Sequence, residues 1–229
     1  MYLIAGPCSI ENEKAIEIAK FVKQNGGTHF RGMLFKPRSS PESFQGLGEE
    51  GLEILEKCRK ILPVVTEVMD KEQIEIVRDV CDIYQVGARN CQNFSLLKEL
   101  GKEDKPVIFK RGFGVKIKEW IAAAEYLNKE GIIFCERGIR TFEDSTRFTF
   151  DINAIPVMKE KGLTIIADPS HAAGERKYVP AIAKAALAAG ADGLLIEVHP
   201  KPEEAKSDTR QQLNFEEFSK LMVEIKAME

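Results

Sequence analysis

The sequence predicts a (β/α)8 barrel formed by one domain over residues 1–229. Short apolar segments alternate with segments of helical apolar spacing along the whole chain, and eight such units can be counted. The strand segments are mostly apolar throughout, as in a parallel sheet that is covered on both faces. The length of 229 residues is slightly below the ~250 residues typical of this fold. A doubly wound open sheet is the alternative architecture.

The predicted strands are short runs of aliphatic and aromatic residues, most of them followed by a polar or charged residue. In chain order they are Tyr2–Ala5, His29–Phe35, Val64–Val68, Ile83–Val86, Val107–Phe109, Ile132–Cys135, Thr164–Ala167 and Gly193–Ile196. The predicted helices carry apolar residues three or four positions apart. They cover Glu11–Gln24, Gly48–Lys60, Lys71–Asp79, Asn93–Leu100, Ile117–Leu127, Ile152–Glu160, Val179–Ala189 and Phe215–Ala227. Asn214 is the expected N-cap of the last helix.

The composition excludes several classes of protein. Basic and acidic residues number 33 and 36, so the net charge of −3 is too balanced for a general nucleic-acid binder. No run reaches the ~18 apolar residues of a membrane span, because Lys184 and Asp192 interrupt the longest candidate. The five cysteines are odd in number and include no C-x-x-C pair, which favours a reducing compartment. We therefore expect a soluble, cytoplasmic protein.

Cationic side chains follow the predicted strands, at the edge where barrel enzymes place their active sites. The stretch Arg31–Gly46 is the richest, since its prolines stiffen a loop that carries basic and hydroxyl side chains. Seven cations follow the second, fourth, fifth and sixth strands: Lys36, Arg38, Arg89, Lys110, Arg111, Arg137 and Arg140. Such a cluster fits two small, multiply charged anions. Arg111 and Arg137 can equally be solvated rim charges, and we leave both out of the predicted site.

Four further residues near the strand ends have the chemistry of metal ligands. They are Cys8, His171, Glu197 and Asp208, from the first, seventh and eighth units, which are neighbours in a closed barrel. Sulfur, nitrogen and oxygen donors together suit Mn²⁺, Fe²⁺, Co²⁺ or Zn²⁺ better than Mg²⁺ or Ca²⁺. His199 is the alternative to His171 as the imidazole ligand. Asp168 is either a helix cap or a partner behind the ligands.

Arg31 and Lys36 raise a problem of register. Side chains alternate between the two faces of a regular strand, so residues five positions apart cannot both point into the barrel. Either Lys36 lies beyond the end of the strand, or the strand contains a bulge, or one of the two residues is structural.

Several short motifs, spread in order over nearly the whole chain, give a specific resemblance. They are Ala5–Ser9, Lys36–Ser40 with Ser43–Gly46, Val86–Asn90, Phe109–Gly112, Glu136–Arg140, Asp168–His171, and Glu197–Pro200 with Ser207–Asp208. Together they resemble the 3-deoxy-D-arabino-heptulosonate 7-phosphate (DAHP) synthases, in the short metal-dependent form without a regulatory domain. Metal-independent relatives carry Asn at the position of Cys8.

The resemblance implies a reaction and a set of site residues. The family condenses phosphoenolpyruvate with erythrose 4-phosphate and water to DAHP and phosphate, the first step of the shikimate pathway to aromatic amino acids. It implies a divalent metal ion on Cys8, His171, Glu197 and Asp208. It further implies that phosphoenolpyruvate is held by Arg31, Lys36, Ala88, Arg89, Lys110 and Arg140, with Glu67 nearby, and that Arg38 and Ser39 hold the phosphate of erythrose 4-phosphate. Lys36 is our candidate proton donor.

The same resemblance predicts a homo-oligomer, a dimer or tetramer, and insensitivity to feedback by aromatic amino acids. Three other functions compete with this interpretation. A 3-deoxy-manno-octulosonate 8-phosphate synthase would use arabinose 5-phosphate, but Lys36-Pro-Arg38 is one residue shorter than the Lys-Ala-Asn-Arg of those enzymes. A Schiff-base aldolase would use Lys110 and need no metal. A binding protein without turnover would bind phosphoenolpyruvate but release no phosphate.

Overall fold

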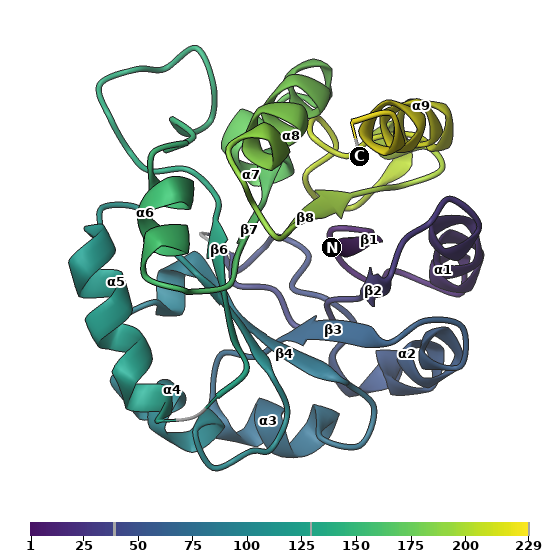
Figure 1. Cartoon of the computed structure of the whole chain (residues 1–229). Coiled ribbons are helices and arrows are strands. Elements are labelled where there is room, and N and C mark those ends of the chain that lie inside the picture. The colour runs from purple at the N-terminus through teal and green to yellow at the C-terminus, as the bar shows by residue number, and fades with distance from the viewer. Residues whose placement is uncertain (39, 129, 229) are drawn as a thin grey trace.

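The computed structural model describes residues 1–38, 40–128 and 130–228, and its parallel strands form a closed barrel (Figure 1). The strands are β1 (Tyr2–Gly6), β2 (His29–Arg31), β3 (Val64–Glu67), β4 (Ile83–Val86), β5 (Val107–Lys110), β6 (Ile132–Glu136), β7 (Ile165–Ala167) and β8 (Gly193–Glu197). Each strand pairs with the next, and Tyr2–Gly6 closes the ring against Gly193–Glu197. The predicted (β/α)8 barrel is confirmed, and the first and last units are neighbours.

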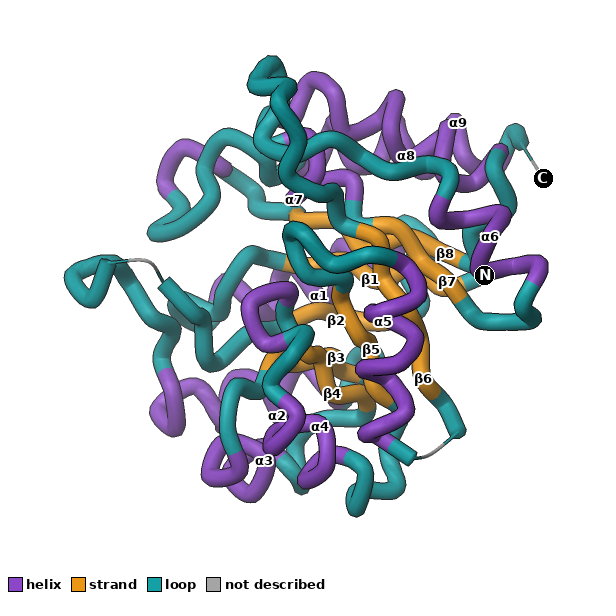
Figure 2. Tube along the Cα trace, turned by 90° about the vertical axis from the view of Figure 1, so that its left-hand side faces the viewer, coloured by secondary structure: helices purple, strands orange, loops and turns teal. Residues whose placement is uncertain are grey.

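Helices surround the strands, which lie at the centre of the molecule (Figure 2). They are α1 (Lys14–Gln24), α2 (Leu52–Arg59), α3 (Lys71–Val77), α4 (Phe94–Leu100), α5 (Ile117–Ala124), α6 (Ala154–Glu160), α7 (Pro169–Ala173), α8 (Val179–Ala188) and α9 (Phe215–Lys226). Asn214 caps α9 as predicted, because its side chain accepts a hydrogen bond from the backbone N–H of Glu217. Within the described part of the chain, no helix has the length and apolar character needed to cross a membrane.

Two apolar layers hold the barrel together. Side chains that include Ile4, Val65, Ile108 and Leu195 fill its interior, and a larger set packs between the strands and the helices. Four of the cysteines, Cys58, Cys81, Cys91 and Cys135, are free and buried in these layers, as the sequence predicts. Burial raises the pKa of the Cys58 thiol to about 12, so it behaves as a small apolar side chain.

The second strand is shorter than predicted. It ends at Arg31 rather than Phe35. The N–H of Gly32 still donates to the carbonyl of Val65 in β3, but from Leu34 onwards the backbone bonds to its own loop instead of the sheet. The carbonyl of Leu34 accepts a hydrogen bond from the N–H of Gly48, and the N–H of Lys36 donates to the carbonyl of Gln45. Lys36 therefore lies in a loop beyond the strand, which removes the conflict of parity with Arg31.

Other differences from the predicted elements occur at helix starts. The helix expected from Gly48 opens with a 3-10 turn over Gly48–Gly51, and the helix expected from Ile152 begins at Ala154. No range was predicted for the short helix α7, although Asp168 was considered as a helix cap. Pro169 occupies its first turn and Gly174 ends it in the left-handed conformation, with φ of 70°. A five-residue helix is too short to give a periodic signal in the sequence.

Candidate active site

A cavity of about 250 Å³ opens at the carboxyl ends of the strands. Most of the predicted site residues line it: Cys8, Arg31, Lys36, Arg38, Glu67, Ala88, Arg89, Lys110, His171 and Asp208. Glu197 is fully buried behind this wall. Arg140 lies outside the cavity, in an adjacent hollow that shares Ala88 and Arg89 with it. Ser39 falls outside the described residues.

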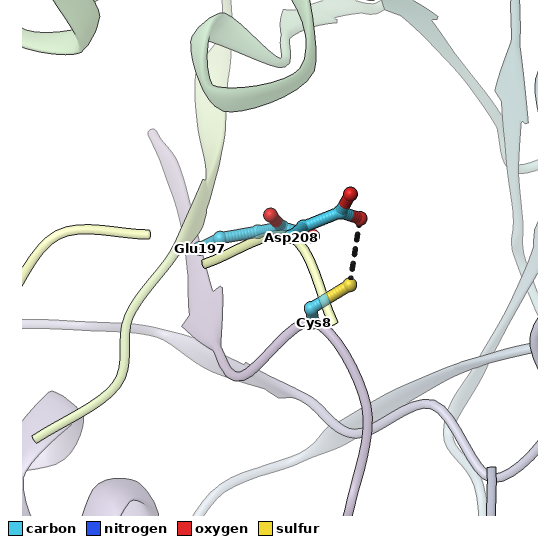
Figure 3. Close-up of side chains that lie close together, drawn as sticks. All are labelled: Cys8, Glu197 and Asp208. Atoms are coloured by element: carbon cyan, nitrogen blue, oxygen red, sulfur yellow. Dashed lines mark hydrogen bonds between the residues drawn. The ribbon is translucent and has the colours of Figure 1, made fainter. Parts of the chain in front are cut away.

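Three of the four predicted metal ligands form one cluster. The ligand atoms of Cys8, Glu197 and Asp208 all lie within 4.8 Å of one another. Figure 3 shows the sulfur of Cys8 pointing at the carboxylate of Asp208, to which it donates a hydrogen bond of 2.9 Å.

The ends of β1 and β2 approach closely because residue 6 is glycine. A Cβ at this position would lie 2.2 Å from the carbonyl oxygen of Arg31.

The fourth predicted ligand, His171, lies beside this cluster. Its Nε2 is 3.4 Å from Oε1 of Glu197, and its Nδ1 is 2.7 Å from Oδ2 of Asp168. Burial lowers the pKa of His171 to about 4, against the attraction of the Asp168 and Glu197 carboxylates. The imidazole is therefore neutral near pH 7, which is the form that binds metals. His199 is turned away, since its Nδ1 lies 2.7 Å from the carbonyl oxygen of Lys201.

The donor set fits a divalent transition metal. Oε1 of Glu197 is buried and accepts no hydrogen bond of regular geometry from any described residue, although Nη2 of Arg31 lies 3.1 Å away. The thiol, the imidazole Nε2 and two carboxylates are the ligand types that such ions prefer. Asp168 behind His171 reproduces the arrangement in which a carboxylate orients a ligating imidazole.

Asp168 combines the two roles considered for it. Its Oδ1 accepts from the backbone N–H of His171, which caps α7, and its Oδ2 is 2.6 Å from Nζ of Lys110. Burial would raise the pKa of Asp168, but His171 and Lys110 outweigh it and hold that pKa well below its usual value. Nζ of Lys110 is therefore held in an ion pair with a buried, ionised carboxylate. A Schiff base would require that nitrogen as a free amine, and this ion pair does not favour it.

Asp208 carries the second depressed pKa. Burial would raise the pKa of this carboxyl, but the ammonium of Lys36 outweighs it, with help from His171 and Arg147, and lowers it. Nζ of Lys36 lies 2.7 Å from Oδ2 of Asp208 and also donates to Sγ of Cys8. Asp208 has φ of 48°, in the left-handed region that non-glycine residues rarely adopt. The surrounding contacts therefore hold an ionised carboxylate in a sparsely populated backbone conformation.

Positive charge dominates the cavity wall. Of its cations, Arg31, Lys36, Lys110 and Arg147 pair with carboxylates. Arg38, Arg89 and Arg137 also line it, and they form no ion pair with any carboxylate of the described residues. Unpaired guanidinium groups in a concave site favour anionic ligands that carry carboxylate or phosphate groups.

Arg137 was left out of the predicted site because it could equally be a solvated rim charge, and the structure contradicts that alternative. Its side chain is 3% exposed, and its guanidinium carbon lies 4.0 Å from the ring centre of Phe148 and 4.9 Å from that of Phe113. Its Nη1 is buried without a hydrogen-bond partner among the described residues. Arg111 is also buried rather than solvated, but its Nη1 is paired with Glu136 and Asp151.

Sequence reasoning also missed Phe113, Arg147 and Gln211. Phe113 and Arg147 line the cavity, and Gln211 donates to the carboxylate of Glu197. Arg137 had a usable signal, because it directly follows the sixth strand. Arg147 and Gln211 lie deep inside long loops, where no periodicity indicates which side chains turn inward.

A family model for the DAHP synthetase I family matches residues 1–229. The chain belongs to the DAHP synthetase I family. A phospho-2-dehydro-3-deoxyheptonate aldolase from Thermotoga maritima is 48% identical over 99% of this chain and 69% of the relative. A 2-dehydro-3-deoxyphosphooctonate aldolase from Francisella tularensis is 35% identical over 90% of this chain and 83% of the relative.

Solved structures agree with this assignment to the DAHP synthetase I family. The crystal structure of the Thermotoga maritima DAHP synthase superposes with a TM-score of 0.95 at 46% identity, over 99% of this chain and 69% of that one. A truncated form of the Thermotoga maritima 3-deoxy-D-arabino-heptulosonate 7-phosphate synthase gives a TM-score of 0.91 at 42% identity, over 100% of this chain and 86% of that one.

Proposed function

We propose that the protein is a DAHP synthase that condenses phosphoenolpyruvate with erythrose 4-phosphate and water, with release of inorganic phosphate. The observation that carries the proposal is that one cavity contains both a group of unpaired cations and the proposed metal ligands. Unpaired cations that suit phosphate and carboxylate groups share the cavity wall with Cys8, His171 and Asp208. The family membership and the 48% identity to a named aldolase of this reaction support it.

The cationic wall would bind phosphoenolpyruvate. Lys110, Arg89 and Arg137 offer charge-assisted hydrogen bonds to its carboxylate and phosphate. Holding both anionic groups fixes the plane of the enol and directs its methylene carbon towards the second substrate. Arg38, which also lines the cavity, is the proposed partner of the aldose phosphate.

Cys8, His171, Glu197 and Asp208 would hold a divalent metal ion, which when bound supplies Lewis-acid polarisation of the aldehyde carbonyl. The methylene carbon of phosphoenolpyruvate then bonds to the aldehyde carbon, and the aldehyde oxygen takes up a proton. Lys36 is the proposed donor of that proton, because its Nζ lies between Cys8 and Asp208 on the cavity wall. Water adds to the former enol carbon and gives up one proton, which replaces the proton that Lys36 donated. The bond from that carbon to the phosphate oxygen then breaks, the hydroxyl on the carbon becomes the keto group of the product, and its proton leaves with the phosphate.

Erythrose 4-phosphate is the proposed second substrate rather than arabinose 5-phosphate. The short Lys36-Pro-Arg38 sequence and the higher identity to the heptonate aldolase, 48% against 35%, both favour the shorter sugar. The proposed location is the cytoplasm, since the five free cysteines suit a reducing compartment. The homo-oligomeric state stays a prediction.

One experiment tests the reaction, the sugar and the metal together. Loss of phosphoenolpyruvate and release of phosphate are followed with erythrose 4-phosphate or arabinose 5-phosphate, each with and without a chelator. We expect turnover of phosphoenolpyruvate with erythrose 4-phosphate but not with arabinose 5-phosphate. We expect the chelator to abolish this turnover. Faster turnover with arabinose 5-phosphate would reassign the enzyme to octulosonate phosphate synthesis. Binding of phosphoenolpyruvate without release of phosphate would reduce it to a binding protein.

A further inference from the structure

Each acidic residue of the proposed metal centre has one oxygen held by a side chain outside the centre. Nε2 of Gln211 donates a hydrogen bond of 2.6 Å to Oε2 of Glu197, and both side chains are buried, at 2% and 0% exposed. This leaves Oε1 of Glu197 on the side of Arg31 and His171. The hydrogen bond therefore sets which oxygen of Glu197 faces the other ligands.

Arg147 connects this contact to Asp208. Its Nη1 donates to Oε1 of Gln211 at 2.8 Å and to Oδ1 of Asp208 at 3.3 Å. The other oxygen of Asp208, Oδ2, contacts Cys8 and Lys36. One guanidinium nitrogen therefore restrains both carboxylates, Asp208 directly and Glu197 through the amide of Gln211.

The position of Arg147 is itself fixed by the backbone. The loop that carries it lies between β6 and α6, projects from the barrel (Figure 1), and is pinned at its base by the bridge between Ile139 and Thr149. The N–H of Arg147 donates to the carbonyl of Ala173 at 3.1 Å, on the short helix that carries His171. Residue 174 is glycine with φ of 70°, and a Cβ there would lie 2.4 Å from Cβ of Arg147.

We propose that Arg147 and Gln211 are positioning residues that orient the two carboxylate ligands of the metal centre. The inference rests on the proposed function, because it presupposes that Cys8, His171, Glu197 and Asp208 bind a metal ion. Partners behind metal ligands typically change metal affinity 10- to 100-fold when they are removed. The proposal makes the loop between β6 and α6 part of the centre, although none of its residues supplies a ligand.

Binding of Co²⁺ to the metal-free protein tests the proposal directly, without turnover. Affinity is measured by competition with a chromophoric chelator, and the visible spectrum of bound Co²⁺ reports the ligand geometry. The variants are Arg147→Met, Gln211→Leu and the double variant. Arg210→Met is the matched control, because Arg210 lies in the same loop as Gln211 but pairs with Glu175 at the surface and is 79% exposed.

We expect Co²⁺ to bind 10- to 100-fold more weakly to Arg147→Met and Gln211→Leu, with an altered spectrum, while Arg210→Met matches the parent. The double variant should lose less than the product of the two single losses, since Arg147 acts partly through Gln211. Arg147→Lys should restore part of the affinity, because an ammonium ion keeps the charge but not the fixed planar geometry. The side chain of Arg147 is 36% exposed, so we expect its substitution to disturb folding less than substitution of the buried Gln211.

Two results would overturn the inference. If both single variants bind Co²⁺ within twofold of the parent and with the same spectrum, Arg147 and Gln211 do not position the ligands, and the proposed function stands. If the parent itself binds no Co²⁺, the metal-dependent part of the proposed function fails as well. Turnover of phosphoenolpyruvate in the presence of a chelator then decides whether the condensation proceeds without a metal ion.

Discussion

Nζ of Lys36 lies 2.7 Å from Oδ2 of Asp208, inside the cluster that we assign to the metal. A proton donor at this place would act on the aldehyde oxygen. We expect Lys36→Met to lower kcat at least ~100-fold, the usual effect of removing a general acid. Its affinity for Co²⁺ should not fall, because a positive charge beside the ligands has been removed. Phosphate release and Co²⁺ titration measure the two effects separately. Near-normal kcat with only a higher KM would withdraw the role of Lys36.

Arg137 and Arg140 give a comparison between matched residues. Both guanidinium groups lie over the ring of Phe113, at 4.9 Å and 5.1 Å, but only Arg137 lines the cavity. We expect Arg137→Met to raise the KM for phosphoenolpyruvate at least ~10-fold, the loss of one charge-assisted hydrogen bond. Arg140→Met should change it less. KM values are measured by steady-state kinetics. A larger increase for Arg140→Met than for Arg137→Met would assign the contact with phosphoenolpyruvate to Arg140, the residue chosen from the sequence.

The sequence predicts the fold and most of the site because two simple regularities apply. Apolar periodicity locates the strands, and the barrel then brings every strand end to one mouth, so that Cys8 and Asp208 meet although they lie 200 positions apart. The site residues that were not predicted are those whose role depends on the direction of a side chain within a loop. Residues such as Arg147 and Gln211 are placed by hydrogen bonds specific to this chain. Arg137 directly follows the sixth strand, but only its burial distinguishes it from a solvated rim charge.

Asp168 couples the two halves of the proposed site. Its Oδ2 lies 2.6 Å from Nζ of Lys110 and 2.7 Å from Nδ1 of His171. We expect Asp168→Asn to weaken Co²⁺ binding 10- to 100-fold and also to raise the KM for phosphoenolpyruvate. The same substitution at Asp192, which bonds to Lys159 and Ile165 at the opposite end of β8, is the control. If the substitution changed only the affinity for Co²⁺, or only the KM for phosphoenolpyruvate, Asp168 would not couple the two halves of the site.

Removal of the metal ion should stop turnover without unfolding the barrel. The apolar layers inside and outside the strands do not involve the proposed ligands Glu197 and Asp208. We expect a chelator to abolish phosphate release while far-ultraviolet circular dichroism is unchanged, and added Mn²⁺, Co²⁺ or Zn²⁺ to restore activity. Cys8→Ser should favour Mn²⁺ over Zn²⁺ relative to the parent, because a hydroxyl is a harder ligand than a thiolate. Full activity in the chelator would contradict the assignment.

The pKa of His171, lowered to about 4 by burial, predicts how the stability of the metal-free protein depends on pH. An unfolded chain binds a proton at histidine below about pH 6.5. Between these two values the unfolded state binds more protons than the folded state, so the free energy of unfolding falls as the pH is lowered. The contribution of His171 to the free energy of unfolding is complete above pH 6.5 and is lost by about pH 4. This is a change of about 3 kcal/mol. Urea unfolding in a chelator should show this fall in the parent and a flatter profile in His171→Gln. Parallel profiles for the two proteins would mean that another group causes the fall.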